Sequence, residues 1–247
     1  MIDLLRPEWE APASVHAYAT TRTGGFSAGP YASLNLGDHV GDDKADVARN
    51  RAHLAQVLSL PQNPDWIRQT HGTHAVLLEA ELDREADAAI TRQPGVVAVI
   101  MTADCLPILL CDRNGTEVAA VHAGWRGLQA GIVDTVITRM CTPPSRLLAW
   151  IGPGISRDYF EVGGEVRSAF LQSDRSCESF FASRRNGRWL CDLPGMTIQV
   201  LSRLGVAAIS CDHHCTYRDE SLFFSYRREG VTGRMASLIW MEPDRVT

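Results

Sequence analysis

Residues 96–132 read VVAVIMTADCLPILLCDRNGTEVAAVHAGWRGLQAGI, and this stretch decides the fold. Three apolar runs in it, at 96–102, 106–111 and 118–122, have the length of short buried strands. A fourth segment, at 128–141, has the spacing of a helix. Buried strands followed by a helix indicate a sheet that carries helices on its faces.

The rest of the chain mixes strands and helices in an irregular order. Asp42 or Asp43 would cap an early helix, and Asn50 and Arg51 would project from its polar side or from the edge of its apolar stripe. This order predicts an α/β or α+β fold with layers around a mixed β-sheet core. Because no repeat or linker interrupts it, we expect a single domain over residues 1–247. The further strands are expected at 15–22, 66–69, 75–78, 147–151, 206–210, 223–226 and 237–241, and the further helices at 44–58, 162–172 and 194–204.

Composition and charge exclude several classes of protein. Hydrophobic residues at 45% and charged residues at 21% are ordinary values for a globular protein. The net charge of −5 provides no basic field for nucleic acid or an anionic membrane surface, and the longest apolar stretch is too short to span a bilayer. Seven cysteines, an odd number, and an N-terminal segment unlike a signal peptide favour reduced thiols and a cytoplasmic location.

Three metal-binding side chains lie at the edges of expected strands. His71, Cys105 and His122 offer two imidazoles and one thiolate, which is the ligand number of an open catalytic zinc site. Such a site keeps its fourth position for water or substrate. Since 34 and 17 residues separate the three ligands, only a sheet fold could gather them. The alternative interpretation is that Cys105 is simply a small core residue.

Arginines near glycine-bearing loops indicate places where an anion could bind. Arg126 lies in HAGWRG between a strand and a helix, where free N–H groups and a guanidinium can hold an anion; a solvated arginine on a tight turn is the alternative. Arg227, Arg228 and Arg234 cluster near the end of the chain, as a phosphate clamp or as a charged strand end. The CDHHC segment at 211–215 has metal-like residues but no matching second half, so we interpret it as structural.

Nine strings along the chain together resemble one known family, long labelled laccase-domain or polyphenol oxidase. They are NLGDHVGDD, NR, QTHG, DAAIT, MTADCLPILLCD, AAVHAGWRGL, IGPGIS, FEVG and FFSYRREGVTGRMASLIW, in this order. The resemblance implies that His71, Cys105 and His122 are zinc ligands. It also implies a single layered α/β domain, similar to a deamidating bacterial toxin domain that uses a Cys–His pair.

The same resemblance implies a purine nucleoside phosphorylase that also deaminates adenosine. Its substrates would be purine nucleosides (adenosine, inosine and methylthioadenosine) and phosphate, with zinc as the cofactor. Zinc-activated water can attack the six-position carbon of a purine, and phosphorolysis needs mainly a positioned phosphate. Arg51, Arg126 and Arg227 or Arg228 are candidates for the phosphate, and Asn35 is a candidate for the base or ribose.

Other functions stay open from the residues alone. Cys105 could be a nucleophile with His122 as its base, as in a hydrolase that edits peptidoglycan precursors, and Asp104 could serve either mechanism or only cap a turn. The His₂Cys set could also bind copper and give weak polyphenol oxidase activity, although the chain has no His-x-His pair for a trinuclear cluster. A metal-buffering module is a third class, and a homodimer is an open oligomeric state.

Overall fold

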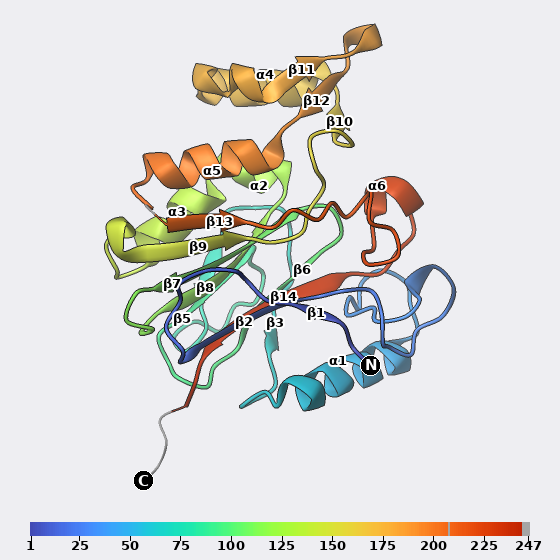
Figure 1. Cartoon of the computed structure of the whole chain (residues 1–247), viewed down its shortest axis with the longest axis vertical. Helices are drawn as coiled ribbons and strands as arrows, with labels where there is room; N and C mark the ends of the chain where they lie inside the picture. The colour runs from blue at the N-terminus through green and yellow to red at the C-terminus, as the bar shows by residue number, and fades with distance from the viewer. Residues whose placement is uncertain (207, 244–247) are drawn as a thin grey trace.

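The computed structural model describes residues 1–206 and 208–243, and two stacked β-sheets form its centre (Figure 1). The first sheet has five strands in the order β1-β2-β14-β6-β3. Its strands are β1 (Leu4–Leu5), β2 (Val15–Thr20), β14 (Met235–Met241), β6 (Ala98–Thr102) and β3 (Asp65–Trp66). Only the β3–β6 pair is parallel. Because β2 pairs with β14, the first and last thirds of the chain meet in this sheet.

The second sheet has six strands in the order β13-β9-β7-β8-β5-β4. Its strands are β13 (Ala208–Cys211), β9 (Leu147–Ile151), β7 (Leu106–Asp112), β8 (Val118–Ala123), β5 (Ala88–Thr91) and β4 (Ala75–Leu77). The central strands are antiparallel, and both edge strands run parallel to their neighbours. This sheet is therefore mixed, which confirms the predicted fold class.

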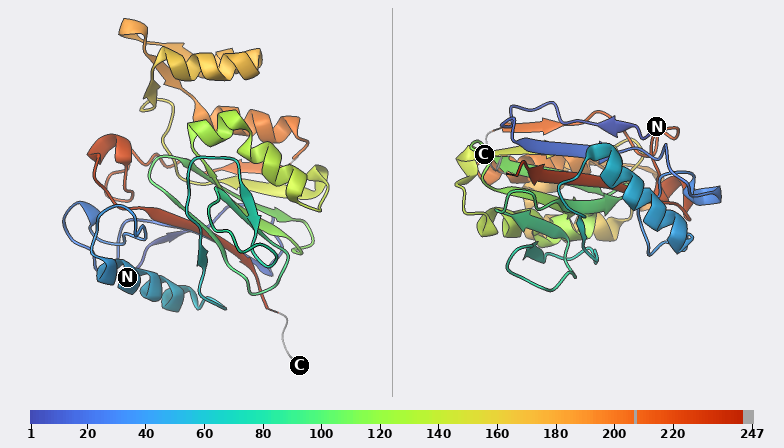
Figure 2. Two further views of the ribbon diagram at one scale, coloured as in Figure 1. Left: turned by 180° about the vertical axis from the view of Figure 1, so that it is seen from behind. Right: turned by 90° about the horizontal axis from the view of Figure 1, so that it is seen from below.

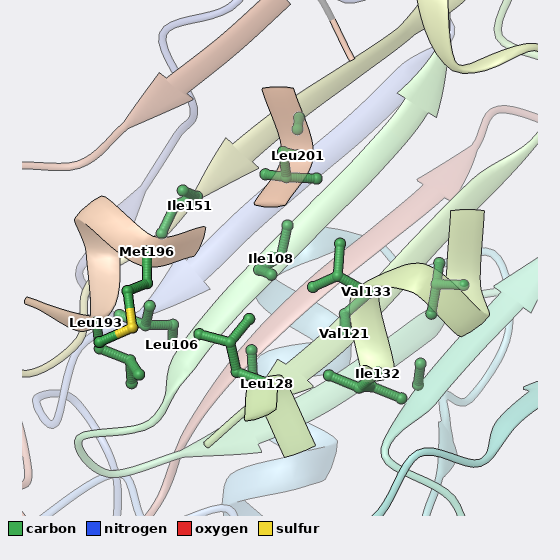
Figure 3. Close-up of a cluster of buried hydrophobic side chains, with 14 of the residues drawn as sticks. Leu106, Ile108, Val121, Leu128, Ile132, Val133, Ile151, Leu193, Met196 and Leu201 are labelled. Carbon is green, nitrogen blue, oxygen red and sulfur yellow. The ribbon is translucent and has the colours of Figure 1, made fainter. Parts of the chain in front are cut away.

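Helices cover both outer faces of the stacked sheets. On the five-stranded sheet, α1 (Lys44–Leu58) buries Leu54 against Val99 and Leu238, and the view from below shows α1 lying across that face (Figure 2). On the six-stranded sheet lie α2 (Trp125–Ala130), α3 (Ile132–Arg139) and α5 (Leu193–Arg203). Leu128, Ile132 and Met196 of these helices pack on the β7 and β8 side chains (Figure 3).

The alternation of side chains along β7 explains the layering. Leu106, Ile108 and Leu110 face the helices, whereas Leu109 and Cys111 face the other sheet. Because both faces of β7 are covered, its sequence is apolar at nearly every position rather than alternating. This is why residues 106–111 could be identified as a buried strand from sequence.

A small third layer is inserted between β9 and α5. It consists of the antiparallel strands β10 (Glu161–Val162), β12 (Trp189–Cys191) and β11 (Phe181–Ser183) with α4 (Gly164–Ser173), and Figure 1 shows it beyond α5 and α2. The backbone N–H of Cys191 donates to the carbonyl oxygen of Phe160 at 3.0 Å, so the two ends of the insertion lie side by side. The remaining elements are α6 (Tyr226–Glu229) and the 3₁₀ turns η1 (Gly29–Tyr31), η2 (Pro144–Arg146), η3 (Arg175–Phe180) and η4 (Arg185–Gly187).

Two sequence predictions about local structure were wrong. The helix expected at 128–141 is two helices, because Gly131 adopts a left-handed φ of 94° that ends α2. The strand expected at 223–226 is absent from the described residues; the side chain of Ser225 instead caps α6 by accepting from the N–H of Arg228. Asn50 lies on the buried stripe of α1, which fits the second of its two predicted positions, the edge of that stripe.

Most of the other predicted elements lie within a few residues of their predicted positions, whereas no prediction covers β1, β5, β10, β11 or β12. The bounds of α1 and β9 match the prediction, and Asp43 caps α1. The strand expected at 206–210 begins at Ala208, and Ala207 lies outside the described residues. In the described part of the chain, no helix is both long and apolar enough to cross a membrane.

Candidate metal centre

The candidate centre lies where the chain passes from one sheet to the other. β6 of the five-stranded sheet ends at Thr102 and β7 of the six-stranded sheet begins at Leu106, so Cys105 is the last residue of the connection. His122 is on the adjacent strand β8, where it pairs with Pro107 of β7. His71 comes from the loop between β3 and β4. The sheet fold thus gathers three residues that are distant in sequence, as predicted.

The three side chains form one compact donor set. Cys105 Sγ lies 3.8 Å from His71 Nε2, and the donor atoms of Cys105, His71 and His122 all lie within 4.8 Å of one another. The two imidazole rings meet edge to face, with centroids 4.7 Å apart. In a tetrahedral zinc site the sulfur and a ligand nitrogen are about 3.6 Å apart, given the usual bond lengths. The chemistry and the spacing of this set therefore fit a metal ion held by three protein ligands.

A buried carboxylate contacts two of the three ligand residues, one through its ring and one through its backbone. Asp87 is fully buried at the start of β5, and its Oδ1 accepts from His122 Nδ1 at 2.8 Å and from the backbone N–H of His71 at 2.9 Å. Its Oδ2 accepts from the N–H of Gly72 at 2.6 Å and from Thr70. A carboxylate behind a ligand histidine fixes the ring orientation and leaves Nε2 free for the metal.

Electrostatics at the centre favour a thiolate. Burial opposes ionisation of Cys105, but the charge and hydrogen bonds of His122 and His71 outweigh it and lower the pKa of the thiol to about 6. Burial likewise opposes protonation of His122, yet Cys105 and Asp87 raise the pKa of this imidazole to about 9. Burial also disfavours the ionised form of Asp87, and hydrogen bonds from His122 and Gly72 still keep the pKa of this carboxyl below its usual value. The metal-free pair is therefore a thiolate beside an imidazolium: Cys105 is already in the form that binds a metal, and His122 would release a proton on coordination.

Two residues of the centre have backbone conformations that side chains rarely adopt. His71 has a φ of 62° and Asp104 a φ of 92°. The carboxylate of Asp104 accepts from the hydroxyl of Thr216 and from the backbone N–H of Arg227, both at 2.7 Å. Asp104 therefore fastens the beginning of α6 to the connection that carries Cys105. Strained conformations held by such contacts concentrate at functional sites.

A cavity of about 500 Å³ opens onto the three side chains. Most of its other walls are apolar and aromatic, and its polar walls are four nitrogen-bearing side chains together with Thr102 and Asp104. The apolar walls are Met101, Trp125, Ile155, Phe160, Leu193 and Tyr226, and the nitrogen-bearing ones are His39, Gln69, Arg227 and Arg234. Its volume and flat aromatic walls suit a heterocyclic ligand such as a nucleoside.

The predicted arginines are not all at the cavity. Arg227 lines it, whereas Arg228 points into the protein and donates to the carbonyl oxygens of Thr216, Tyr217 and Phe223. Arg126 is exposed on α2, outside the cavity wall, with its guanidinium 4.4 Å from the Trp125 ring centroid.

The two candidates from the early loop do not line the cavity either. Arg51 donates to the carbonyl oxygen of Leu36, and its guanidinium lies over the Trp66 ring. Asn35 is fully buried; its amide oxygen accepts from the N–H groups of Gly37 and Arg234, and its amide nitrogen donates to Asp42 and to the carbonyl of Gly37. Both residues thus shape the loop that packs against Arg234.

Sequence reasoning did not single out Asp87, and it grouped Arg234 with Arg227 and Arg228 as a phosphate clamp or a charged strand end. The only signal for Asp87 is a carboxylate immediately before the apolar strand Ala88–Thr91. The CDHHC segment matches the structural interpretation: Cys215 is buried and accepts from the backbone and hydroxyl of Ser156, while His214 pairs with Asp212. Among the described residues, His71, Cys105 and His122 are the one cluster with metal-ligand geometry.

Comparisons with known proteins identify the family of this chain. The family model described as multi-copper polyphenol oxidoreductase laccase matches residues 16–242. Purine nucleoside phosphorylase YfiH of Escherichia coli is 45% identical over 243 residues, covering 98% of this chain and all of the relative. A purine nucleoside phosphorylase of Haemophilus influenzae is 43% identical over 241 residues, covering 96% and 99%.

Solved structures extend the likeness to three dimensions. A Neisseria meningitidis protein superposes with a TM-score of 0.93 at 44% identity, covering 97% of this chain and 99% of its own. YlmD from Geobacillus stearothermophilus superposes with a TM-score of 0.85 at 34% identity, covering 97% and 96%. The chain therefore belongs to the multi-copper polyphenol oxidoreductase laccase family, in which the full-length curated relatives compared above are named purine nucleoside phosphorylases.

Proposed function

We propose that this protein is a zinc-dependent purine nucleoside phosphorylase that also deaminates adenosine. Its substrates would be adenosine, inosine and methylthioadenosine, with phosphate as the second substrate. The observation that carries the proposal is an open His71–Cys105–His122 donor set in the wall of a largely apolar cavity of nucleoside size. The names of the full-length relatives support the same chemistry.

In phosphorolysis the cavity would bind and orient both reactants. A phosphate oxygen forms a bond to the anomeric carbon of the ribose while the bond to the purine nitrogen breaks. The base leaves with that electron pair and takes the proton that the phosphate gives up, so the products are free base and ribose 1-phosphate. The aromatic rings of Trp125, Phe160 and Tyr226 provide flat surfaces for the base, and arginine side chains provide charge for the phosphate.

In deamination one water replaces the six-amino group of adenosine, giving inosine and ammonia. A zinc held by His71, Cys105 and His122 would supply the Lewis acidity that makes water nucleophilic near neutral pH. Asp87 holds the His122 ring in place through Nδ1. The apolar walls of the cavity exclude bulk water from the purine. We propose that residues 1–247 form one catalytic domain and that the enzyme works in the cytoplasm with reduced thiols.

Product analysis tests this function directly. Zinc-loaded protein would be incubated with adenosine or inosine, with and without phosphate, and the products identified by mass spectrometry. We expect base and ribose 1-phosphate only when phosphate is present, and inosine from adenosine in both conditions. Base release that is independent of phosphate would identify a hydrolase instead. Metal analysis of the purified protein would distinguish zinc from copper, which the same His₂Cys donors can bind.

One observation favours a second function, a thiol hydrolase acting on amides such as peptidoglycan precursors. Asp87, His122 and Cys105 also have the order of an orienting carboxylate, a base and a nucleophile. This mechanism has no use for His71, whereas metal binding needs it. A His71→Ala variant that keeps its amidase activity and its reactive thiol would support the hydrolase, and loss of metal together with nucleoside activity would support the phosphorylase.

A further inference from the structure

Arg234 is held rigidly at the cavity wall by a loop from the other end of the chain. Its backbone N–H donates to the amide oxygen of Asn35 at 2.9 Å, and its carbonyl oxygen accepts from Leu36 at 3.1 Å. Gly37 lies so close that a Cβ there would be 2.8 Å from Arg234 Cγ. Nη1 donates to the carbonyl oxygens of Thr232 and Gly233 at 3.0 Å each. The stem and one edge of this guanidinium are therefore fixed before any ligand binds.

Arg234 forms no ion pair in the part of the chain that the structure describes, and Cys105 and Asp104 favour its charge only through Coulomb attraction. Within residues 1–206 and 208–243, its guanidinium nitrogens lie farther than 4.0 Å from every carboxylate oxygen. The residue is half-buried, and this burial lowers the pKa of its guanidinium. Taking a cation out of water without a partner costs free energy, which a bound anion would offset. Nε and Nη2, which make no hydrogen bond to described residues, remain available to such an anion.

Arg227 lines the same cavity and has a similar arrangement. Its Nη1 donates to the carbonyl oxygen of Glu161 at 2.7 Å, and its guanidinium lies 5.2 Å from the Phe160 ring centroid. Its other guanidinium nitrogens make no hydrogen bond to described residues. The carboxylate that lines the cavity, Asp104, is occupied by Thr216 and by the backbone of Arg227. The cavity thus has two arginines with free donors, and its lining carboxylate is already engaged.

We infer that Arg227 and Arg234 together bind a phosphate group in this cavity. The inference rests on the function proposed above, in which the group is orthophosphate, the second substrate. Guanidinium forks suit this ligand because each can donate two parallel hydrogen bonds to a phosphate, and two cations match its double charge. The 5′-phosphate of a nucleotide offers the same chemistry, so the experiment tests both sources.

The test uses the zinc-loaded full-length protein and three variants. Arg234→Gln and Arg227→Gln remove one cavity cation each, and Arg185→Gln is the matched control, because Arg185 is exposed and outside the cavity. Binding of orthophosphate and of a nucleoside 5′-monophosphate would be measured by calorimetry without nucleoside. Initial rates of base release from inosine would be measured over a range of phosphate concentrations.

We expect each cavity variant to raise the Kd and the KM for phosphate about 10- to 100-fold, as for lost charge-assisted hydrogen bonds. The KM for inosine should stay within about twofold of wild type, and the Arg185→Gln control should match wild type. Arg234→Lys should recover only part of the lost phosphate affinity, because lysine keeps the positive charge without the two parallel donors of a guanidinium. Stronger binding of the monophosphate, lost in the same variants, would assign the subsite to a nucleotide.

Failure of the inference and failure of the proposed function give different results. Phosphate-dependent turnover with an unchanged phosphate KM in both cavity variants would overturn the subsite and leave the function intact. Turnover without phosphate would overturn the proposed phosphorylase function. Calorimetry would then decide the subsite separately, because a wild-type protein that binds no phosphate has no such subsite. Melting temperature and zinc content would confirm folding. If Arg234→Gln does not fold, Arg227→Gln decides, since that side chain is exposed.

Discussion

Replacing Asp87 by asparagine keeps the shape of a fully buried side chain but turns one acceptor oxygen into an NH₂ donor. In the native protein both oxygens face donors: Oδ1 faces His122 Nδ1 and the N–H of His71, and Oδ2 faces Gly72 and Thr70. Whichever way the amide is turned, its NH₂ group meets an N–H. The variant therefore disturbs either the two histidine ligands or the turn between Thr70 and Gly72.

The size of the effect follows from these contacts. Loss of one carboxylate behind a ligand histidine weakens metal binding about 10- to 100-fold. Because Asp87 contacts both His71 and His122, we expect a loss near the upper end, about 100-fold, or about 2.7 kcal/mol. The buried N–H groups left without acceptors should also lower the stability of the metal-free protein by about 1–3 kcal/mol.

The assay is competition for zinc against a chromophoric chelator, together with thermal unfolding with and without metal. Asp112→Asn is the matched control, because Asp112 is also buried and accepts from the backbone N–H groups of Asn114, Thr116 and Glu117, far from any ligand contact. The control should lose stability but keep wild-type zinc affinity. A folded Asp87→Asn protein with wild-type zinc affinity would refute the assigned role of Asp87.

Two further predictions concern Cys105 as a metal ligand, and a third concerns the ion pairs of Glu229. Cys105→Ala should stay folded but lose stoichiometric zinc in metal analysis, because it removes the thiolate ligand; full occupancy would contradict the site. Iodoacetamide should alkylate Cys105 slowly with zinc bound and rapidly after chelation, as followed by mass spectrometry; equal rates would exclude coordination. Burial opposes ionisation of Glu229, but hydrogen bonds from Thr232, Arg228 and Arg22 lower the pKa of its carboxyl. The ionised carboxylate therefore stabilises the fold above the pKa of the unfolded chain, about 4.3. This stabilisation is lost as the pH falls through the lowered pKa of the folded protein. Glu229→Gln should therefore be less stable than wild type at pH 7, with a smaller difference in acid; a constant difference in denaturant titrations would argue against this linkage.

The sequence predicted an element best where a single local feature, such as a capping residue or an apolar stripe, marked it. Asp43 caps α1 and Leu54 lies on its buried stripe, so both the start and the inner face of this helix could be predicted. The aromatic pair Phe223 and Phe224 resembles a strand locally, but both rings are buried in a cluster with Met235 and the next residue, Ser225, caps a helix. Strands of two residues, such as Glu161–Val162, exist only through their partners, so no periodicity could reveal them.

For the site, the sequence revealed the metal-binding side chains but not the residues that act through tertiary contacts. His71, Cys105 and His122 were identifiable because metal ligands have few chemical types and followed apolar strands. The role of Asp87 depends on hydrogen bonds to residues 16 and 35 positions away, which no local pattern contains. Which arginine faces the cavity depends on tertiary packing: adjacent Arg227 and Arg228 point to different surroundings.

The insertion between β9 and α5 gives this fold a route to diversify. Its ends are joined by the 3.0 Å hydrogen bond between Cys191 and Phe160, so a segment of different length or sequence can replace it without moving the strands that carry Cys105 and His122. Phe160 and Leu193, at the two boundaries, form part of the cavity wall. Recombination or drift in this one segment would therefore reshape this part of the cavity wall while the donor set stays intact. New specificities can evolve there independently of the metal chemistry.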